Sequence, residues 1–365
     1  MNANLSRVAF TDIPGWAQHD PTAAFLAFRR SCQEMLEQGT GFSRAVKFGG
    51  SPSSWREVCV AAFETQHAQE FFESRFSAWQ VKDGERPDGL FTGYFEPEVE
   101  GSRSGGPGFH VPIYRRPDDL VAFTGEEQRQ TGLTVGRRIR GAAQPYLTRR
   151  EIEGGALTGQ DLEIVWLKDW ADAFFIQIQG SGRVRFSDGS SMRLSFAAKS
   201  GLPYTGIGGL LVDRGVLGPD EVSMQTIRKW MTAHPIDART LMWENQSFVF
   251  FRDVKLEDPH LGALGAQHVQ LTPQRSLAAD RFLWMFGTPV WLDTQVPTGD
   301  ERRPAEFRQL LIVQDTGSAI KGLARGDVYW GFGEEAARVA GPMKSEGRMT
   351  VLLPHAVAAE LGLET

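Results

Sequence analysis

The stretch that decides the fold lies near the C-terminus, at residues 310–322 with the sequence LLIVQDTGSAIKG, and GDVYWG follows it at 326–331. An apolar run leads Asp315 into a glycine-rich turn, and Asp327 opens the next predicted strand. Two carboxylates at the ends of adjacent barrel strands can share one groove, and such pairing separates their pKa values. Alternatively, both carboxylates only cap turns, as Asp-Thr-Gly readily does. Spacing alone leaves both interpretations open.

Short apolar runs separated by turn signals continue along most of the chain. The 40 glycines and 19 prolines are spread rather than clustered, which favours a turn-rich β protein. Helical periodicity fills residues 20–80, with Asp20-Pro21 as the predicted start, and short helices are predicted from Thr148 and over 220–233. The sequence thus predicts β barrels preceded by helices. The predicted strands are 90–97, 111–115, 163–167, 174–179, 183–187, 247–252, 290–292, 310–313, 327–330 and 350–353.

Composition restricts the classes of function. At 365 residues the chain exceeds the usual size of one core, so two domains or one large insertion are expected. The net charge of −6 comes without a basic stripe, so nucleic acid is not an expected partner. No run approaches 18 apolar residues, and no transmembrane segment is expected. The seven histidines lack ligand spacing, so no metal site is predicted. Gly206-Ile207-Gly208-Gly209 does not complete a dinucleotide fingerprint, and no cofactor is predicted.

The two cysteines and the N-terminus bear on the cellular compartment. Cys32 and Cys59 lie on neighbouring helical stretches and are either two small buried side chains or a disulfide, which would imply export. The first residues, MNANLSR, show no apolar segment of a signal peptide. The chain is therefore expected to be cytoplasmic, or to have lost its export segment.

A second candidate stretch is 176–183, IQIQGSGR. As a strand, it would place Gln177 and Gln179 on one face, because side chains alternate. Paired amides suit sugar hydroxyl and acetamido groups, and the small residues that follow would let a ligand approach the backbone. The alternative is a hairpin with incidental glutamines. The G-x-S-x-G pattern of a nucleophile elbow is absent.

Asp315-Thr316-Gly317 also resembles the active-site motif of aspartic proteases. Those enzymes need two such motifs that face each other and share a proton, and this chain has one. An aspartic-protease-like peptidase is therefore a remote alternative.

Several motifs together resemble the membrane-bound lytic murein transglycosylase A family, in the family's order and over roughly residues 90–353. They are FTGYFEP at 91–97, PIYR at 112–115, IQIQGSG at 176–182, FSDGS at 186–190, SMQTIR at 223–228, NQSFVF at 245–250, ADR at 279–281 and the whole stretch 315–333. The resemblance implies a mainly β fold: a double-psi β barrel from residues 1–104 and 246–365, with N-terminal helices. Residues 105–245 would form an inserted smaller β-barrel domain, the other wall of a glycan groove.

The same resemblance implies a function and a set of site residues. The family's three aspartates fall at Asp280, Asp315 and Asp327, with Asp327 as the catalytic acid and base and Asp315 as a supporting carboxylate. The expected reaction cleaves the β-1,4 bond between N-acetylmuramic acid and N-acetylglucosamine and forms a 1,6-anhydromuramyl product, a carbon–oxygen lyase reaction. The expected substrate-binding residues are Thr92, Tyr94, Glu96, Gln177, Gln179, Ser181, Gly182, Lys321 and Asp280.

The expected partner is the glycan strand of peptidoglycan, bound by a monomer. The expected location is the periplasm, with the full-length form associated with the outer membrane through a signal or lipid anchor absent from this chain. A non-catalytic peptidoglycan-binding protein on the same barrel is the main alternative, and the presence of Asp327 argues against it.

Overall fold

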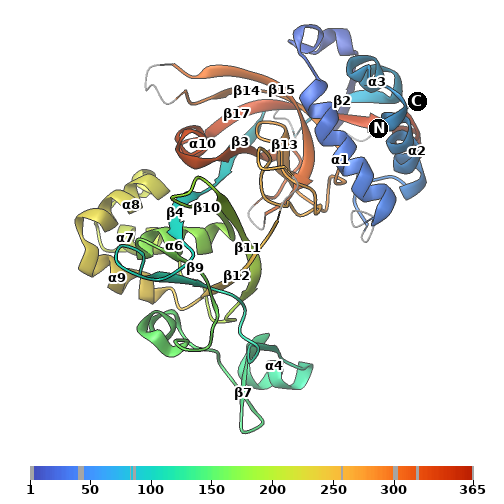
Figure 1. The fold of residues 1–365 in the computed structure, drawn as a ribbon. Helices are drawn as coiled ribbons and strands as arrows, with labels where there is room; N and C mark the ends of the chain where they lie inside the picture. The colour runs from blue at the N-terminus through green and yellow to red at the C-terminus, as the bar shows by residue number, and fades with distance from the viewer. Residues whose placement is uncertain are drawn as a thin grey trace. The chain divides into compact units, whose positions relative to one another are not determined.

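The structure is a computed structural model that describes residues 4–39, 45–82, 84, 88–255, 258–298, 303–317 and 320–363. The chain forms two compact units, one from Met1–Phe95 with Asp258–Thr365 and the other from Glu96–Glu257 (Figure 1). The second unit is therefore inserted into the first. The family resemblance implied junctions after residues 104 and 245, and the compact units divide after residues 95 and 257.

Six strands of the first unit close into a barrel. Around it the order is β17, β14, β15, β13, β16 and β3, and β3 pairs again with β17. Strands β1 and β2 extend the sheet outward from β17. This barrel and the N-terminal helices confirm the predicted fold class. The bounds are β1 Leu5–Val8, β2 Phe76–Val81, β3 Gly89–Glu96, β13 Ser276–Ala279, β14 Pro289–Val296, β15 Ala305–Asp315, β16 Arg325–Phe332 and β17 Lys344–Pro354.

The apolar run that precedes Asp315 is the centre of this unit's core. All four residues at 310–313 are fully buried in β15. A strand covered on both faces is apolar at successive positions rather than at alternate ones. Here β15 lies in the barrel wall and also contacts helix α1, Thr22–Glu37. The strand that ends at Asp315 is thus held rigidly.

The predicted N-terminal helical region consists of three helices and a strand. Pro21 is the N-cap residue of α1, and the Asp20 carboxylate accepts the Thr22 N–H at 2.9 Å. The prediction of helix through residue 80 was wrong at its end, because Phe76–Val81 is strand β2, between β1 and β17. Its Phe, Trp and Val side chains suit a pleated, buried strand, and tertiary pairing overrides the helical spacing. The other helices of this unit are α2 Pro52–Glu64, α3 Ala68–Arg75, α10 Gly333–Ala340, α11 His355–Glu360, and the short 3-10 helices Phe10–Asp12 and Trp16–Gln18.

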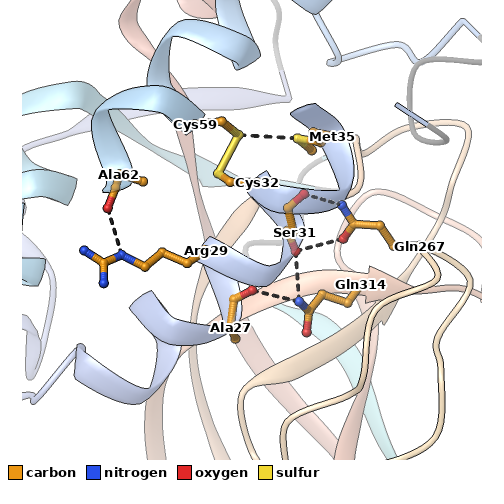
Figure 2. Close-up of a disulfide and its surroundings, with 9 residues drawn as sticks. All are labelled: Ala27, Arg29, Ser31, Cys32, Met35, Cys59, Ala62, Gln267 and Gln314. Carbon is orange, nitrogen blue, oxygen red and sulfur yellow. Dashed lines mark hydrogen bonds between the residues drawn. A yellow bond between two sulfur atoms is a disulfide. The ribbon is translucent and has the colours of Figure 1, made fainter. Parts of the chain in front are cut away.

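A disulfide joins the first two helices. Cys32 of α1 and Cys59 of α2 are bonded, and both are fully buried (Figure 2). Of the two possibilities that the sequence left open, the structure has the disulfide.

Replacing both cysteines with alanine is expected to lower the free energy of unfolding by about 3 kcal/mol, because the bridge closes a loop with a sequence separation of 27. Urea denaturation followed by tryptophan fluorescence measures the loss. Dithiothreitol should destabilise the wild type to the same extent and leave the double variant unchanged. A wild-type protein whose stability is insensitive to the reductant would contradict this expectation.

The inserted unit is built on a second six-stranded sheet, in the order β12, β11, β10, β4, β9 and β5. An isolated bridge between Arg115 and Phe251 links its first and last strands. The strands are β4 Glu98–Ser102, β5 Val111–Tyr114, β9 Glu163–Leu167, β10 Ser181–Arg185, β11 Ser191–Lys199 and β12 Val249–Asp253, with a small separate sheet of β6 Val121–Ala122, β7 Val135–Ile139 and β8 Ala142–Gln144. The helices are α4 Gly125–Thr131, α5 Arg149–Glu151, Ile152–Ala156 (a π-helix), α6 Trp170–Gln179, α7 Ile207–Asp213, Pro219–Glu221 (3-10), α8 Met224–Ala233 and α9 Pro235–Glu244.

The predicted strand at 174–179 was wrong, because these residues belong to helix α6. The Asp169 carboxylate caps its first turn by accepting the Asp172 N–H at 2.8 Å, and Gly180 ends it with φ +75°. An Asp cap and a glycine in the left-handed region are ordinary helix boundary signals. The antiparallel strands β10 and β11 are joined by a turn that contains Asp188-Gly189, and the short helix predicted from Thr148 begins there with a capping box.

Over the residues that are described, every helix is too short or too polar to cross a membrane.

Candidate active site

The two carboxylates singled out by the sequence lie on strands that flank β13. Ala278 of β13 pairs with Asp315 on one side and with Asp327 on the other. Because neighbouring strands are about 4.8 Å apart, both aspartates reach the same region of the barrel. Between Leu277 and Ala278 the pairing with β15 skips Gln314, a bulge that changes the direction of the chain just before Asp315.

Asp327 is half-buried and is bound by a neighbouring hydroxyl group. Thr92 of β3 donates its O–H to Asp327 Oδ1 at 2.7 Å, and Arg325 Nη2 donates to Thr92 Oγ1 at 2.9 Å. Arginine has only donors, so Arg325 must use a lone pair of the threonine oxygen. The single hydroxyl proton of Thr92 is therefore directed at Asp327 Oδ1, and the other carboxyl oxygen, Oδ2, is the one that can carry a proton.

Asp315 accepts three hydrogen bonds. Its Oδ1 accepts the backbone N–H groups of Ala266 and Thr316, each at 2.9 Å, and its Oδ2 accepts the Tyr94 hydroxyl at 2.9 Å. Burial, followed by the charge of Asp315, raises the pKa of Tyr94 well above its ordinary value, so its hydroxyl stays protonated and donates. The lone pairs of Asp315 are thus directed at fixed donors.

The pKa values of both carboxyl groups are raised, mainly by burial. For Asp327, burial and the charge of Asp315 raise the pKa, and the Thr92 hydrogen bond and the Arg325 charge oppose them. For Asp315, burial outweighs the three hydrogen bonds, which lower the pKa. A carboxyl group with a raised pKa holds its proton further toward neutral pH, which is what a general acid requires.

Asp280 binds the backbone shortly before strand β16. This buried carboxylate accepts the Phe282 N–H at 3.0 Å and the Gly322 N–H at 3.1 Å. The exposed Lys321 lies beside it, with Nζ 4.0 Å from Asp280 Oδ1 and 4.8 Å from the centre of the Phe282 ring. Ser318 and Ala319, part of the motif quoted from the sequence, are outside the described residues.

Glu96 lies within the inserted unit and has a buried partner. Its carboxylate, with the residue 1% exposed, accepts from Arg193 Nε at 2.9 Å and lies 2.8 Å from Arg193 Nη2. Burial raises the pKa of Glu96, and the charge of Arg193 opposes that rise. The geometry therefore gives Glu96 a role inside this unit.

Gln177 is also engaged internally. Its Oε1 accepts from Arg149 Nη2 at 2.8 Å, and Arg149 is itself 1% exposed and paired with Glu153. Gly182 is required for packing, since a Cβ there would lie 2.8 Å from the Ile176 side chain.

The two remaining predicted residues of the inserted unit, Gln179 and Ser181, are more accessible. Gln179 is exposed at the end of α6, and Ser181 is half-buried at the start of β10. The shared strand face expected for Gln177 and Gln179 does not exist, because both are on a helix.

Three arginines that were not predicted from the sequence, Arg149, Arg193 and Arg325, bind these residues. Arg325 lies two positions before Asp327 on the same strand, so the period of two could have revealed it. Arg149 and Arg193 meet their partners only through tertiary folding, and no local signal identifies them. Among the described residues, no group of three or more His, Cys, Asp or Glu side chains could hold a metal ion.

Two family models match the chain. The MltA specific insert domain matches residues 90–252, and the 3D domain matches residues 275–353. Membrane-bound lytic murein transglycosylase A of Escherichia coli K12 is 30% identical over 301 residues, which are 81% of this chain and 74% of that protein. The chain belongs to the membrane-bound lytic murein transglycosylase A family.

Other members of this family are also similar to the chain in sequence and in structure. The protein of the same name from Vibrio cholerae is 33% identical over 71% of this chain, and the match spans 64% of that relative's length. The crystal structure of the membrane-bound lytic murein transglycosylase from Agrobacterium tumefaciens superposes with a TM-score of 0.81 at 33% identity, covering 98% of this chain and 99% of that one. E. coli MltA with bound chitohexaose gives a TM-score of 0.64 at 27% identity, with 90% of each chain covered.

Proposed function

We propose that the chain is a peptidoglycan lytic transglycosylase that cleaves the β-1,4 bond between N-acetylmuramic acid and N-acetylglucosamine. Its relatives carry the name of that activity, and one is crystallised with chitohexaose, a β-1,4-linked sugar oligomer. The observation that carries the proposal is the state of Asp327, a half-buried carboxyl group whose pKa is raised and which has one oxygen left to hold a proton.

In the first step, Asp327 acts as the acid. Its Oδ2 donates a proton to the glycosidic oxygen, the bond from that oxygen to C1 of N-acetylmuramic acid breaks, and the leaving sugar keeps the proton as its hydroxyl group. The positive charge that develops at C1 is stabilised by the acetamido group of the same sugar or by dipoles of the site. Asp327 is now ionised.

In the second step, the same carboxylate acts as the base. It removes the proton of the C6 hydroxyl group, whose oxygen attacks C1 and closes the 1,6-anhydro ring. Hydrolytic glycosidases need a second carboxylate to place water or to hold the sugar. Here the nucleophile belongs to the substrate, so Asp315, which is occupied by three donors, serves as a supporting charge.

We assign the remaining predicted residues by their accessibility. Thr92 and Tyr94 act through the two aspartates, and Asp280 acts through the loop that it holds. The exposed Lys321, Gln179 and the half-buried Ser181 are the candidates for direct contact with the glycan.

Glu96, Gln177 and Gly182 support the inserted unit. Glu96 and Gln177 are each bound to a buried arginine, and Gly182 is packed against Ile176. These contacts favour a structural role over direct glycan binding. We also propose that the protein works as a monomer in the periplasm, with its full-length form at the outer membrane, since its relatives are named membrane-bound and act on murein.

The pH profile of kcat/KM is expected to be bell-shaped. The alkaline limb should report loss of the proton from Asp327, at a pH above the ordinary aspartate value of 3.8, and the acid limb should report protonation of Asp315. Thr92→Val removes the hydrogen bond that lowers the Asp327 pKa, so its alkaline limb should move to higher pH. The measurement is the rate of anhydro-product release as a function of pH, from about 3 to about 9, which extends from below the ordinary pKa of aspartate to well above it. An alkaline limb that stays in place in this variant would contradict the assignment.

Digestion of purified murein distinguishes the proposed activity from the alternatives. A lytic transglycosylase releases muropeptides that are lighter by one water molecule than the products of hydrolysis, which mass spectrometry detects. A binding protein would release nothing, and a peptidase would release stem peptides. Either of these results would reject the proposed function.

A further inference from the structure

Three fully buried polar side chains meet where helix α1 packs against the end of strand β15. Ser31 of α1 donates its hydroxyl to Gln267 Oε1 at 2.8 Å and accepts from Gln314 Nε2 at 2.8 Å. All three residues are 0% exposed. Figure 2 shows them together, next to the Cys32–Cys59 disulfide. We call Ser31, Gln267 and Gln314 the Ser31 cluster.

The Ser31 cluster is adjacent in the chain to the groups that hold Asp315. Gln314 directly precedes Asp315 and is the residue that the β15 pairing skips. Gln267 directly follows Ala266, whose N–H binds Asp315 Oδ1 at 2.9 Å. The backbone N–H of Gln267 also donates to the Gln314 carbonyl at 3.1 Å, so the two segments are joined beside the carboxylate.

The cluster uses the polar atoms of its side chains inside the protein. Gln314 Nε2 donates to the Ala27 carbonyl at 2.9 Å as well as to Ser31, and Gln314 Oε1 accepts from the Ser276 hydroxyl. Gln267 Nε2 donates to the Ser31 carbonyl at 3.3 Å. Buried amides need such partners, and a fully satisfied network fixes one arrangement of the segments that it joins.

Helix α1 is the fixed side of the network. Ala27 and Ser31 are one helical turn apart, so they present their acceptors on one face. Cys32, the next residue, ties the helix to α2 through the disulfide (Figure 2). The bulge at Gln314 is thus anchored to helix α1, and the disulfide in turn links α1 to α2.

We propose that the Ser31 cluster is a positioning device for the acidic pair. It holds the bulge at Gln314 and the Ala266 N–H in the arrangement that fixes the position of the Asp315 carboxylate. Through the charge of that carboxylate, it influences the protonation of Asp327. The inference rests on the proposed transglycosylase function. Ser31, Gln267 and Gln314 are positioning residues, since none of them contacts either aspartate side chain through its own side chain.

The test is Ser31→Ala, assayed for anhydro-product release from purified murein with the full chain. Removing the hydroxyl leaves two amides without a shared partner, so the Ala266 N–H loses its alignment. We expect kcat to fall about tenfold to a hundredfold with KM within about twofold, because only the geometry of the acid changes. The acid limb of the pH profile should also move to higher pH by about half a unit. The hydrogen bond from the Ala266 N–H lowers the pKa of Asp315, and this bond weakens in the variant.

A matched control is Ser77→Ala, another buried serine of the same unit, which accepts from Trp79 Nε1 at 3.0 Å on strand β2. It should keep the wild-type kcat and pH limbs even if it lowers stability. If Ser31→Ala does not fold, Gln267→Met replaces it, with the same expected loss and limb shift. Variants with wild-type kcat and an unmoved acid limb overturn the inference, whereas an inactive wild type overturns the proposed function instead.

Discussion

An Asp327→Asn variant is expected to release anhydromuropeptides at least about four orders of magnitude more slowly than the wild type, because in the proposed mechanism this one group acts as both acid and base. Asparagine retains the size and an oxygen that can accept the Thr92 hydroxyl, but its amide neither donates a proton to a leaving oxygen nor recovers one. The measurement is the initial rate of product release from purified murein, followed by mass spectrometry.

A binding measurement distinguishes loss of the catalytic step from loss of the binding site. The variant should retain affinity for chitohexaose within a few-fold, measured by calorimetry, because the change removes no contact surface. Asp293→Asn is the matched control. This carboxylate is in the same barrel, but it pairs with Arg308 at 3.0 Å, and Arg308 lies on β15 well before Asp315. The control should keep full activity. Turnover by Asp327→Asn near the wild-type rate would refute the catalytic role.

The stability of the same variant follows from the direction of the pKa shift. A carboxyl group whose pKa is raised by folding contributes stability below its unfolded pKa, and that contribution is lost as the pH rises through the folded value. At neutral pH the wild type therefore bears the cost of a half-buried charge that asparagine lacks. Asp327→Asn should unfold at a higher temperature than the wild type at pH 7, and the gain should shrink as the pH approaches 3.8.

Replacing Glu96 with alanine is expected to destabilise the inserted unit by about 3–5 kcal/mol, because it leaves the Arg193 charge buried without its carboxylate partner. Urea denaturation measured by far-UV circular dichroism gives the loss. The variant tests the role of Glu96 directly, since the family resemblance placed it among the substrate-binding residues and the geometry places it in an ion pair.

The compensating control is the double variant Glu96→Leu with Arg193→Met. Apolar replacement of both partners is expected to recover most of the stability, as buried ion pairs commonly tolerate such exchange. If the stable double variant also keeps its KM for murein, Glu96 is structural. A stable double variant with a much weaker KM would instead return Glu96 to the set of glycan-binding residues.

Much of the barrel could be predicted from the sequence because local and tertiary signals agree there. The apolar run 310–313 is buried on both faces, and the aspartates follow directly at strand ends, so position along the chain places them together. Short strands bounded by Gly and Asp were predicted for the same reason. The disulfide, by contrast, could be named only as one of two possibilities, since sequence spacing does not fix the distance between helices.

The inserted unit shows where sequence patterns fail. Residues 174–179 have the apolar and polar alternation of a strand, yet the Asp169 cap and Gly180 make them the last part of a helix. Attention to both boundary residues would have corrected the prediction. The partners of Gln177 and Glu96 are arginines at 149 and 193, which are distant in the chain, and nothing near either residue signals that its polar group is already used.

The arrangement of Thr92 and Arg325 around Asp327 has a consequence for the order of events. With Oδ1 committed to the threonine hydroxyl, both proton transfers of the proposed mechanism would pass through a single atom, Oδ2. The oxygen of the departing sugar and the incoming C6 oxygen cannot occupy that place together, so the first must move away before the second arrives. The cleaved strand must therefore separate by at least a few ångströms while the cationic sugar is still open, and a small alcohol diffusing into that interval would compete with C6 for the same carbon.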